Sequence, residues 1–207
     1  MHQASKEERQ NFYKGCVWKG NRMEISQWKT KLEGARANKD SFFAQQWQSP
    51  IPPQDKPRFK GLEYYPPDPS YRFELELHEH REKQAVRMTY TKGNEQDFVR
   101  WGEFRFKVGG KEQVLQTYKR NPGEETLFVP FKDATSGKET YGAGRYLDLE
   151  PERDRTADGK WVLDFNQAYN PWCAYSEAYT CPFVPVENWL EVPIQAGEKN
   201  YPLREGH

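Results

Sequence analysis

The sequence predicts a mainly β protein with minor α content, built as an antiparallel barrel or sandwich of about eight strands. Aromatic residues make up 15% of the 207 residues although hydrophobic residues reach only 35%, so large rings must supply much of the core. The 15 prolines and 15 glycines favour short strands joined by turns. From Tyr71 onwards, apolar and polar residues alternate, which is typical of strands with one buried face.

The N-terminal part of the chain predicts a helical segment that packs on the core. Apolar residues recur at helical spacing up to Gly34, which we expect to end a first helix, and Asn38 can cap a second one. The spaced apolar residues are Ile25, Trp28, Leu32, Phe43 and Trp47. We therefore predict one structural domain with a helical segment over residues 1–48 and an antiparallel β domain over residues 49–207.

Between helix and strands, the chain is rich in proline. Ser49 to Pro69 holds seven of the prolines, which favours an extended strap across the surface. Its expected anchors are Phe59, Leu62, Tyr64 and Tyr65.

Alternating residues and turn signals predict the strands in order. The expected strands are residues 72–78, 86–90, 104–108, 114–118, 127–131, 145–149, 161–165 and 190–194. Gly109 and Gly110 supply the positive φ angles of a two-residue hairpin turn, and Asp158 with Gly159 turns the chain before the seventh strand. Consecutive antiparallel strands follow from this pattern.

Charge and cysteine content restrict the class of protein. The 31 basic and 31 acidic residues cancel, so we expect no nucleic-acid partner and no membrane partner. Met1 to Gln10 lacks the apolar stretch of a signal peptide, and no apolar run approaches the roughly 20 residues of a membrane span. We expect a cytoplasmic location, in which the three cysteines remain reduced.

Polar residues converge after the strand at residues 127–131. Asp133 either forms an Asx-turn with the following backbone amides or lies with Thr135, Tyr141 and Arg145 around a pocket mouth. Arg145 either pairs with a carboxylate or holds an anionic ligand. The carboxylates available for the ion pair are Asp133, Asp148 and Asp164.

A second polar segment follows the predicted strand at 161–165. Asp164, Asn166 and Asn170 either fix the following loop by binding backbone amides or contact a ligand. We expect this segment and residues 133–145 to meet, because their polar groups need partners.

Cysteine and histidine spacing gives no metal or triad signature. Cys173 and Cys181 match neither a zinc knuckle nor a short redox motif, and they are expected as reduced thiols unless an oxidising setting closes a disulfide. His78 and His80 share a polar strand face. No metal site is predicted, and no cofactor is identified.

Several motifs together resemble the prokaryotic domain-of-unknown-function family 1684. They are Phe131-Lys132-Asp133-Ala134-Thr135-Ser136-Gly137, Thr140-Tyr141, Gly144-Arg145-Tyr146-Leu147, Leu163-Asp164-Phe165-Asn166, Tyr169-Asn170-Pro171, Cys173-Ala174, Thr180-Cys181-Pro182, Glu187-Asn188 and Ala196-Gly197-Glu198-Lys199. The resemblance covers nearly the whole chain after about the first thirty residues. It implies kinship and no reaction, substrate or catalytic residue.

Three classes of function stay open. The first is a β domain that binds a small anionic ligand in a pocket near Arg145. The second is a hydrolase-like enzyme with Asp133 or Asp164 as general base. The third is a protein-interaction module that presents Trp18, Trp28 and Trp47. The predicted ligand-binding residues are Asp133, Thr135, Tyr141, Arg145, Asp164, Asn166, Asn170, Cys173, Asn188 and Glu198.

Overall fold

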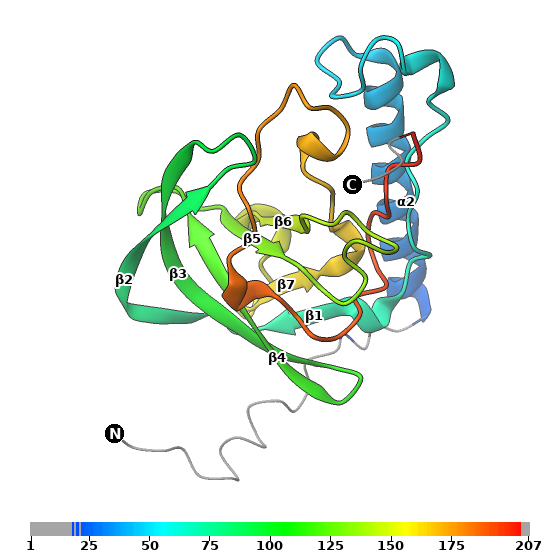
Figure 1. The fold of residues 1–207 in the computed structure, drawn as a ribbon. Helices are drawn as coiled ribbons and strands as arrows, with labels where there is room; N and C mark the ends of the chain where they lie inside the picture. Colours follow the sequence, from blue (N-terminus) through cyan, green and yellow to red (C-terminus); the bar gives the residue numbers. More distant parts are fainter. Residues whose placement is uncertain (1–17, 19, 21, 204–207) are drawn as a thin grey trace.

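A five-stranded antiparallel sheet forms the larger part of the fold (Figure 1). The computed structural model describes residues 18, 20 and 22–203. Met1 to Gln10 and Cys16 lie outside the described residues, as do the start of the predicted helical segment 1–48 and the end of the predicted β domain 49–207. The strands are β2 (His78–Thr89), β3 (Glu95–Val108), β4 (Lys111–Lys119), β5 (Leu127–Phe131) and β6 (Arg145–Leu149), adjacent in that order. The predicted Gly-Gly hairpin joins β3 to β4, with φ angles of 56° and 81° at Gly109 and Gly110.

The neighbours in this sheet pair over very different lengths. Strands β3 and β4 share a register that runs from Val99 opposite Lys119 to Val108 opposite Lys111. The register between β4 and β5 consists of one pair, Tyr118 opposite Phe128. Strands β5 and β6 pair along their whole length, from Leu127 opposite Leu149 to Phe131 opposite Arg145.

A two-stranded antiparallel sheet, β1 (Arg72–Leu75) with β7 (Trp161–Asp164), contributes to the same core. Phe73 of β1 packs on Phe106 of β3, with ring centroids 5.1 Å apart, and on Phe165 directly after β7. The two sheets confirm the mainly β antiparallel class. No closed barrel forms within residues 22–203.

The eighth predicted strand, residues 190–194, is wrong. Leu190, Val192 and Ile194 are buried as the alternation requires, but the segment forms only scattered backbone hydrogen bonds, such as Leu190 N to Lys132 O at 2.7 Å. The pattern therefore indicated burial, and it did not report whether a neighbouring strand was available for pairing.

The helical prediction is right in type and wrong in its division. One helix, α2 (Arg22–Gln45), replaces the two predicted helices, and Gly34 lies within it without a nearby atom to clash with. Leu32 and Phe43 are its buried residues. Arg36 fixes it to the rest of the fold by donating to the carbonyls of Tyr65 (2.9 Å) and Asn166 (3.1 Å). None of the described helices has the length and apolar character needed to span a bilayer.

Short helical turns occur in the connecting segments. They are η1 (Lys56–Arg58), η2 (Pro69–Tyr71), α3 (Pro151–Asp154), η3 (Phe165–Gln167), η4 (Trp172–Ala174) and η5 (Val186–Asn188). The proline-rich strap folds into turns and η1 before it runs along the C-terminal segment, where Tyr64 bridges to Glu198. Its predicted anchors Phe59 and Leu62 pack on a small cluster that contains Phe43.

Candidate functional site

Arg145 is enclosed in the protein interior. Its side chain is 0% exposed, and its guanidinium donates to Asp133 Oδ2 and to Ile194 O, each at 2.9 Å. The carbonyls of Ala196 and Glu198 accept further bonds from the same group. Of the two alternatives, the structure has the ion pair, so Arg145 is not at a pocket mouth.

Asp133 is equally engaged. Its Oδ1 accepts the Thr135 amide at 2.8 Å, the Thr135 hydroxyl at 2.6 Å and the Ile194 amide at 3.2 Å. The first of these bonds is the Asx-turn. Because Oδ2 binds Arg145, both carboxylate oxygens have buried partners, and this geometry gives no support to a general base at Asp133.

Asp164 and Asn166 connect β7 to the helix and the strap. The Asp164 carboxylate is fully buried and accepts Trp28 Nε1 at 2.7 Å, the Asn166 amide at 3.0 Å and Asn166 Nδ2 at 2.9 Å. Asn166 also exchanges hydrogen bonds with the backbone of Asp68. These contacts agree with the loop-fixing alternative.

The remaining predicted amide and carboxylate residues also bind the chain itself. Glu198 is 1% exposed, accepts the Asn170 amide at 2.8 Å and forms an ion pair with Lys39 of α2. Asn188 joins β4 to β5, because its side chain donates to Gln116 O and Pro130 O and accepts the Gln116 amide. Both residues therefore hold elements together.

The polar side chains of the two segments pair within their own segment and not across, since Arg145 binds Asp133 and Asp164 binds Asn166. A backbone bridge links the two regions one residue beyond the first segment. Tyr146 and Tyr169 exchange two hydrogen bonds of 2.9 and 3.1 Å between their amides and carbonyls. Since side chains alternate along a strand, the face of β6 that carries Tyr146 and Asp148 is opposite to the face that carries Arg145. A pocket lies on the Tyr146 face.

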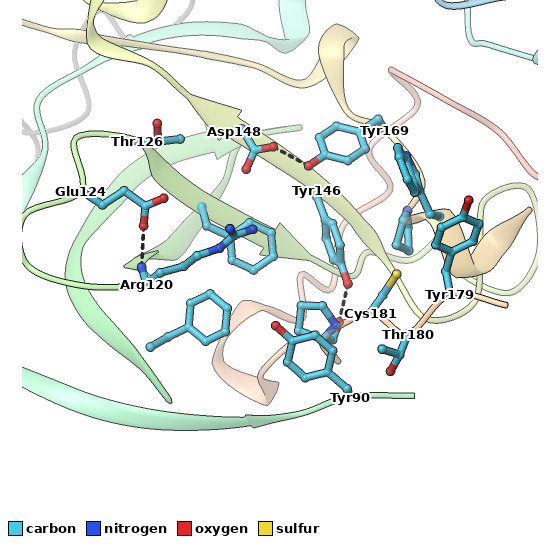
Figure 2. Close-up of a pocket in the computed structure, with 15 residues that line it drawn as sticks. Tyr90, Arg120, Glu124, Thr126, Tyr146, Asp148, Tyr169, Tyr179, Thr180 and Cys181 are labelled. Carbon is cyan, nitrogen blue, oxygen red and sulfur yellow. Dashed lines mark hydrogen bonds between the residues drawn. The ribbon is translucent and has the colours of Figure 1, made fainter. Parts of the chain in front are cut away.

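This aromatic pocket has a volume of about 310 Å³ (Figure 2). Its walls come from Tyr90 directly after β2, from β3, β5 and β6, from the β4–β5 connection, and from the loop that contains η4. The lining residues are Tyr90, Phe98, Arg120, Glu124, Thr126, Phe128, Tyr146, Asp148, Tyr169, Pro171, Trp172, Tyr179, Thr180, Cys181 and Pro182. Phe128 and Tyr146 meet edge to face at 4.9 Å, as do Trp172 and Tyr179.

Three charged residues line this pocket, the basic Arg120 and the acidic Glu124 and Asp148. Figure 2 shows the side chain of Arg120 extending into the pocket from the rim; its backbone amide binds Glu124 Oε2 at 2.7 Å. Asp148 accepts the Tyr169 hydroxyl, and burial raises the pKa of its carboxyl. Asp148 and Tyr169 also line a smaller cavity of about 190 Å³.

Two cysteine thiols lie at the loop side of the pocket. The Cys173 amide donates to Cys181 Sγ at 3.4 Å, and the Tyr141 hydroxyl lies 3.7 Å from Cys173 Sγ. A hydrogen bond from the Cys173 thiol lowers the pKa of Cys181 to about 7, against the opposing effect of burial. The pKa of Cys173 is correspondingly raised.

The other predicted features lie elsewhere. No group of three or more His, Cys, Asp or Glu residues that could hold a metal ion occurs in the described part of the chain. His80 shares a hydrogen bond of 2.7 Å with Gln116. Trp18 and Trp28 pack edge to face at 5.9 Å beside β1, whereas Trp47 is 84% exposed.

Sequence reasoning found strand β6 but did not predict any residue that lines the pocket. Of its predicted residues none lines the aromatic pocket, although Tyr146 and Asp148 share β6 with Arg145. The alternation of residues along β6 could have indicated this pocket, because Tyr146 and Asp148 lie on the strand face opposite Arg145. The contributions of Tyr90 and Phe98 depend on the curvature of the sheet, which no local pattern reports.

Comparisons with known proteins give one family of unknown function and one uncharacterized structural neighbour. The model of the family "Protein of unknown function (DUF1684)" matches residues 57–199. A solution NMR structure of an uncharacterized protein of Haloarcula marismortui is 39% identical, with a TM-score of 0.66 over 86% of this chain and 96% of that one. A comparison with curated proteins gives no match.

Proposed function

The chain belongs to the family of proteins of unknown function DUF1684, and from its geometry we propose that it binds a small anionic molecule in the aromatic pocket. The observation that carries the proposal is the pocket itself. Its volume of about 310 Å³ falls within the range of roughly 300 to 1,000 Å³ common for small-molecule sites. Such sites combine apolar walls with a few polar groups, as this one does.

The rings favour a ligand with a flat or apolar body. Phe128 and Tyr146 form one wall, and Trp172 with Tyr179 forms another, each pair already in edge-to-face contact. An apolar body between these walls would be removed from water against aromatic surface, which contributes about 25 cal/mol for each Å² buried. Trp172 is 41% exposed before any ligand binds.

The positive charge of Arg120 favours a ligand with a negative charge. No carboxylate of the described chain lies within ion-pair distance of its guanidinium, unlike the guanidinium of Arg145. A carboxylate or phosphate of a ligand can accept two parallel hydrogen bonds from such a group. Asp148 lies in the same pocket and can accept a hydrogen bond from a ligand hydroxyl or amine.

The test is a thermal-shift screen of small carboxylates and phosphates on three proteins: wild type, Arg120→Gln and Arg81→Gln. Arg81 is an exposed arginine of β2 that does not line the pocket, so it controls for the loss of one positive charge. We expect some compounds to stabilise wild type and Arg81→Gln, and to stabilise Arg120→Gln at least about tenfold more weakly in apparent affinity. Equal stabilisation of all three would place the ligand elsewhere, and no stabilisation by any compound would reject the proposal.

Amide chemical shifts locate the bound compound independently. A compound that stabilises the wild type is titrated into ¹⁵N-labelled protein. The largest shifts are expected at Phe128, Asp148 and Thr180, which belong to three separate segments of the pocket wall. Shifts confined to β1 and α2 would contradict the proposed location.

A further inference from the structure

The Cys173–Cys181 pair has features that the ligand proposal does not use. Neither cysteine forms a disulfide in this structure, and both are buried, with exposed fractions of 6% and 8%. The Cys173 amide donates to Cys181 Sγ at 3.4 Å, and the Cys173 thiol donates to the same sulfur. The two sulfur atoms are therefore neighbours, although seven residues separate them in sequence.

The two thiols differ in access. Cys181 lines the aromatic pocket, whereas Cys173 does not. Figure 2 shows the Cys181 sulfur between Tyr146 and the loop that carries Tyr179 and Thr180. A molecule that enters the pocket reaches Cys181 first.

The surroundings of Cys181 favour the thiolate at that sulfur. Backbone amides at Trp172 and Cys173 and the thiol of Cys173 all stabilise negative charge there. Tyr90, Tyr146 and Tyr169 interact electrostatically with Cys181, and burial raises the pKa of all three phenols, so they stay neutral near pH 7. Cys181 is thus the group in this cluster that ionises first.

We propose that Cys173 and Cys181 form a dithiol that reacts with small organic disulfides entering the aromatic pocket, with Cys181 as the attacking sulfur and Cys173 as the resolving one. The Cys181 thiolate attacks one sulfur of a disulfide RSSR, forming a Cys181–SR mixed disulfide and releasing RS⁻, which takes up a proton from water. Cys173 then loses its proton and attacks Cys181 Sγ, which forms the Cys173–Cys181 disulfide and releases the second RS⁻. The protein is oxidised by two electrons, and RSSR is reduced to two RSH.

This reaction does not depend on an anionic ligand at Arg120. The pocket serves it as the path by which RSSR reaches Cys181. Failure of the ligand screen would therefore leave the thiol chemistry intact, and failure of the thiol chemistry would leave the screen intact.

The experiment uses the reduced full-length chain with 2-hydroxyethyl disulfide as probe. Cys16 lies outside the described residues, so every protein carries Cys16→Ser. Intact mass is followed with time for this parent protein, for Cys173→Ser and for Cys181→Ser. We expect the parent to lose two hydrogens, Cys173→Ser to stop with one hydroxyethylthio group attached, and Cys181→Ser to react at least about tenfold more slowly.

A quenched sample of the parent protein tests the order without any cysteine variant of the pair. Peptide mapping after brief reaction and acid quenching should find the mixed disulfide on Cys181 and not on Cys173. The pH profile of Cys181 alkylation by iodoacetamide should have its midpoint near 7, and Cys173→Ala should raise it.

Three results would overturn the proposal. One is a parent protein whose two thiols stay unmodified until urea unfolds it, which would make them inert core thiols. The second is stable attachment of a separate group to each cysteine with no internal disulfide. The third is first attachment at Cys173.

Discussion

Arg145 Nη2 lies 2.9 Å from Asp133 Oδ2, and neither side chain is exposed to solvent. The pair is surrounded by further hydrogen-bonding groups, namely three backbone carbonyls for the two Nη atoms of the guanidinium and the Thr135 and Ile194 amides for the carboxylate. The ion pair therefore organises the C-terminal segment around β6.

Removal of the Arg145 charge should strongly destabilise the fold. Arg145→Ala leaves the Asp133 carboxylate buried without its cation, which costs about 3 to 5 kcal/mol for buried pairs. Urea unfolding measures the loss. Arg87→Ala is the matched control, because Arg87 pairs with Asp97 at the surface, where solvent screens the pair, and that change should leave the free energy of unfolding nearly unchanged. Equal losses in the two variants would show that Arg145 is not the interior anchor described.

Asn188→Ala should loosen the contact between β4 and β5. The substitution leaves Gln116 O, Gln116 N and Pro130 O without their Asn188 partner, and one unsatisfied buried group costs about 1 to 3 kcal/mol. We expect a total loss of about 2 to 4 kcal/mol in urea unfolding. Asn121→Ala, in an exposed turn, should cost under about 1 kcal/mol. A loss at Asn188 as small as the one at Asn121 would contradict the bridging role.

Alanine substitutions at Gly197 and Gly159 should distinguish the cost of a positive φ angle from the cost of a steric clash. An added Cβ at Gly197 (φ 78°) would lie 2.7 Å from the carbonyls of Phe165 and Ala168, whereas at Gly159 (φ 86°) it would meet open space. Gly159→Ala should cost about 1 kcal/mol from the backbone conformation alone. Gly197→Ala should cost about 2 to 4 kcal/mol, because the clash adds to it. Thermal unfolding of both variants checks the order, and the reverse order would reject the close approach of residues 165–168 to Gly197.

Asp148 predicts a pH dependence of stability. Because burial raises its pKa in the fold, the folded state binds this proton more tightly than the unfolded chain does. Stability is therefore lost as pH rises from the ordinary carboxyl pKa of about 3.9 through the raised value. Asp148→Asn removes this loss, so its free energy of unfolding relative to wild type should increase as pH rises above about 4.

Tyr169→Phe tests the same group from the other side. The Tyr169 hydroxyl lowers the Asp148 pKa by donating to the carboxylate, so its removal should raise that pKa further and enlarge the loss of stability with rising pH. Urea unfolding at several pH values measures both variants. A constant difference between wild type and Asp148→Asn at every pH would show that this carboxyl does not titrate differently in the fold.

The positions of the strands could be predicted from the sequence more accurately than the pairing between them. The bounds of β5 and β6 were predicted as the structure has them, because short apolar runs there end in turn residues. Gly34 was misread as a helix end, since the burial of Leu32 and Phe43 on either side of it outweighs the cost of about 1 kcal/mol for one glycine. Local patterns report propensity, and tertiary packing decided this element.

The candidate site could be predicted only in part for a related reason. Polar residues were expected to find partners, and Arg145 and Asp164 found them in the interior. The pocket instead uses residues whose side chains look ordinary in sequence, such as Tyr90 and Phe128. They come together because the sheet curves and the η4 loop covers them.

Strands β4 and β5 are paired at one position, Tyr118 opposite Phe128, so the large sheet consists of a β2–β4 part and a β5–β6 part with a weak junction, or seam, between them. The aromatic pocket spans both parts of the sheet, with Phe98 from β3, Tyr90 directly after β2, and Phe128 and Tyr146 from β5 and β6. A molecule held in the pocket would contact both parts of the sheet and would oppose their separation at the β4–β5 junction. Deuterium exchange at the amides beside the seam should then slow more than exchange at the centre of the β3–β4 ladder.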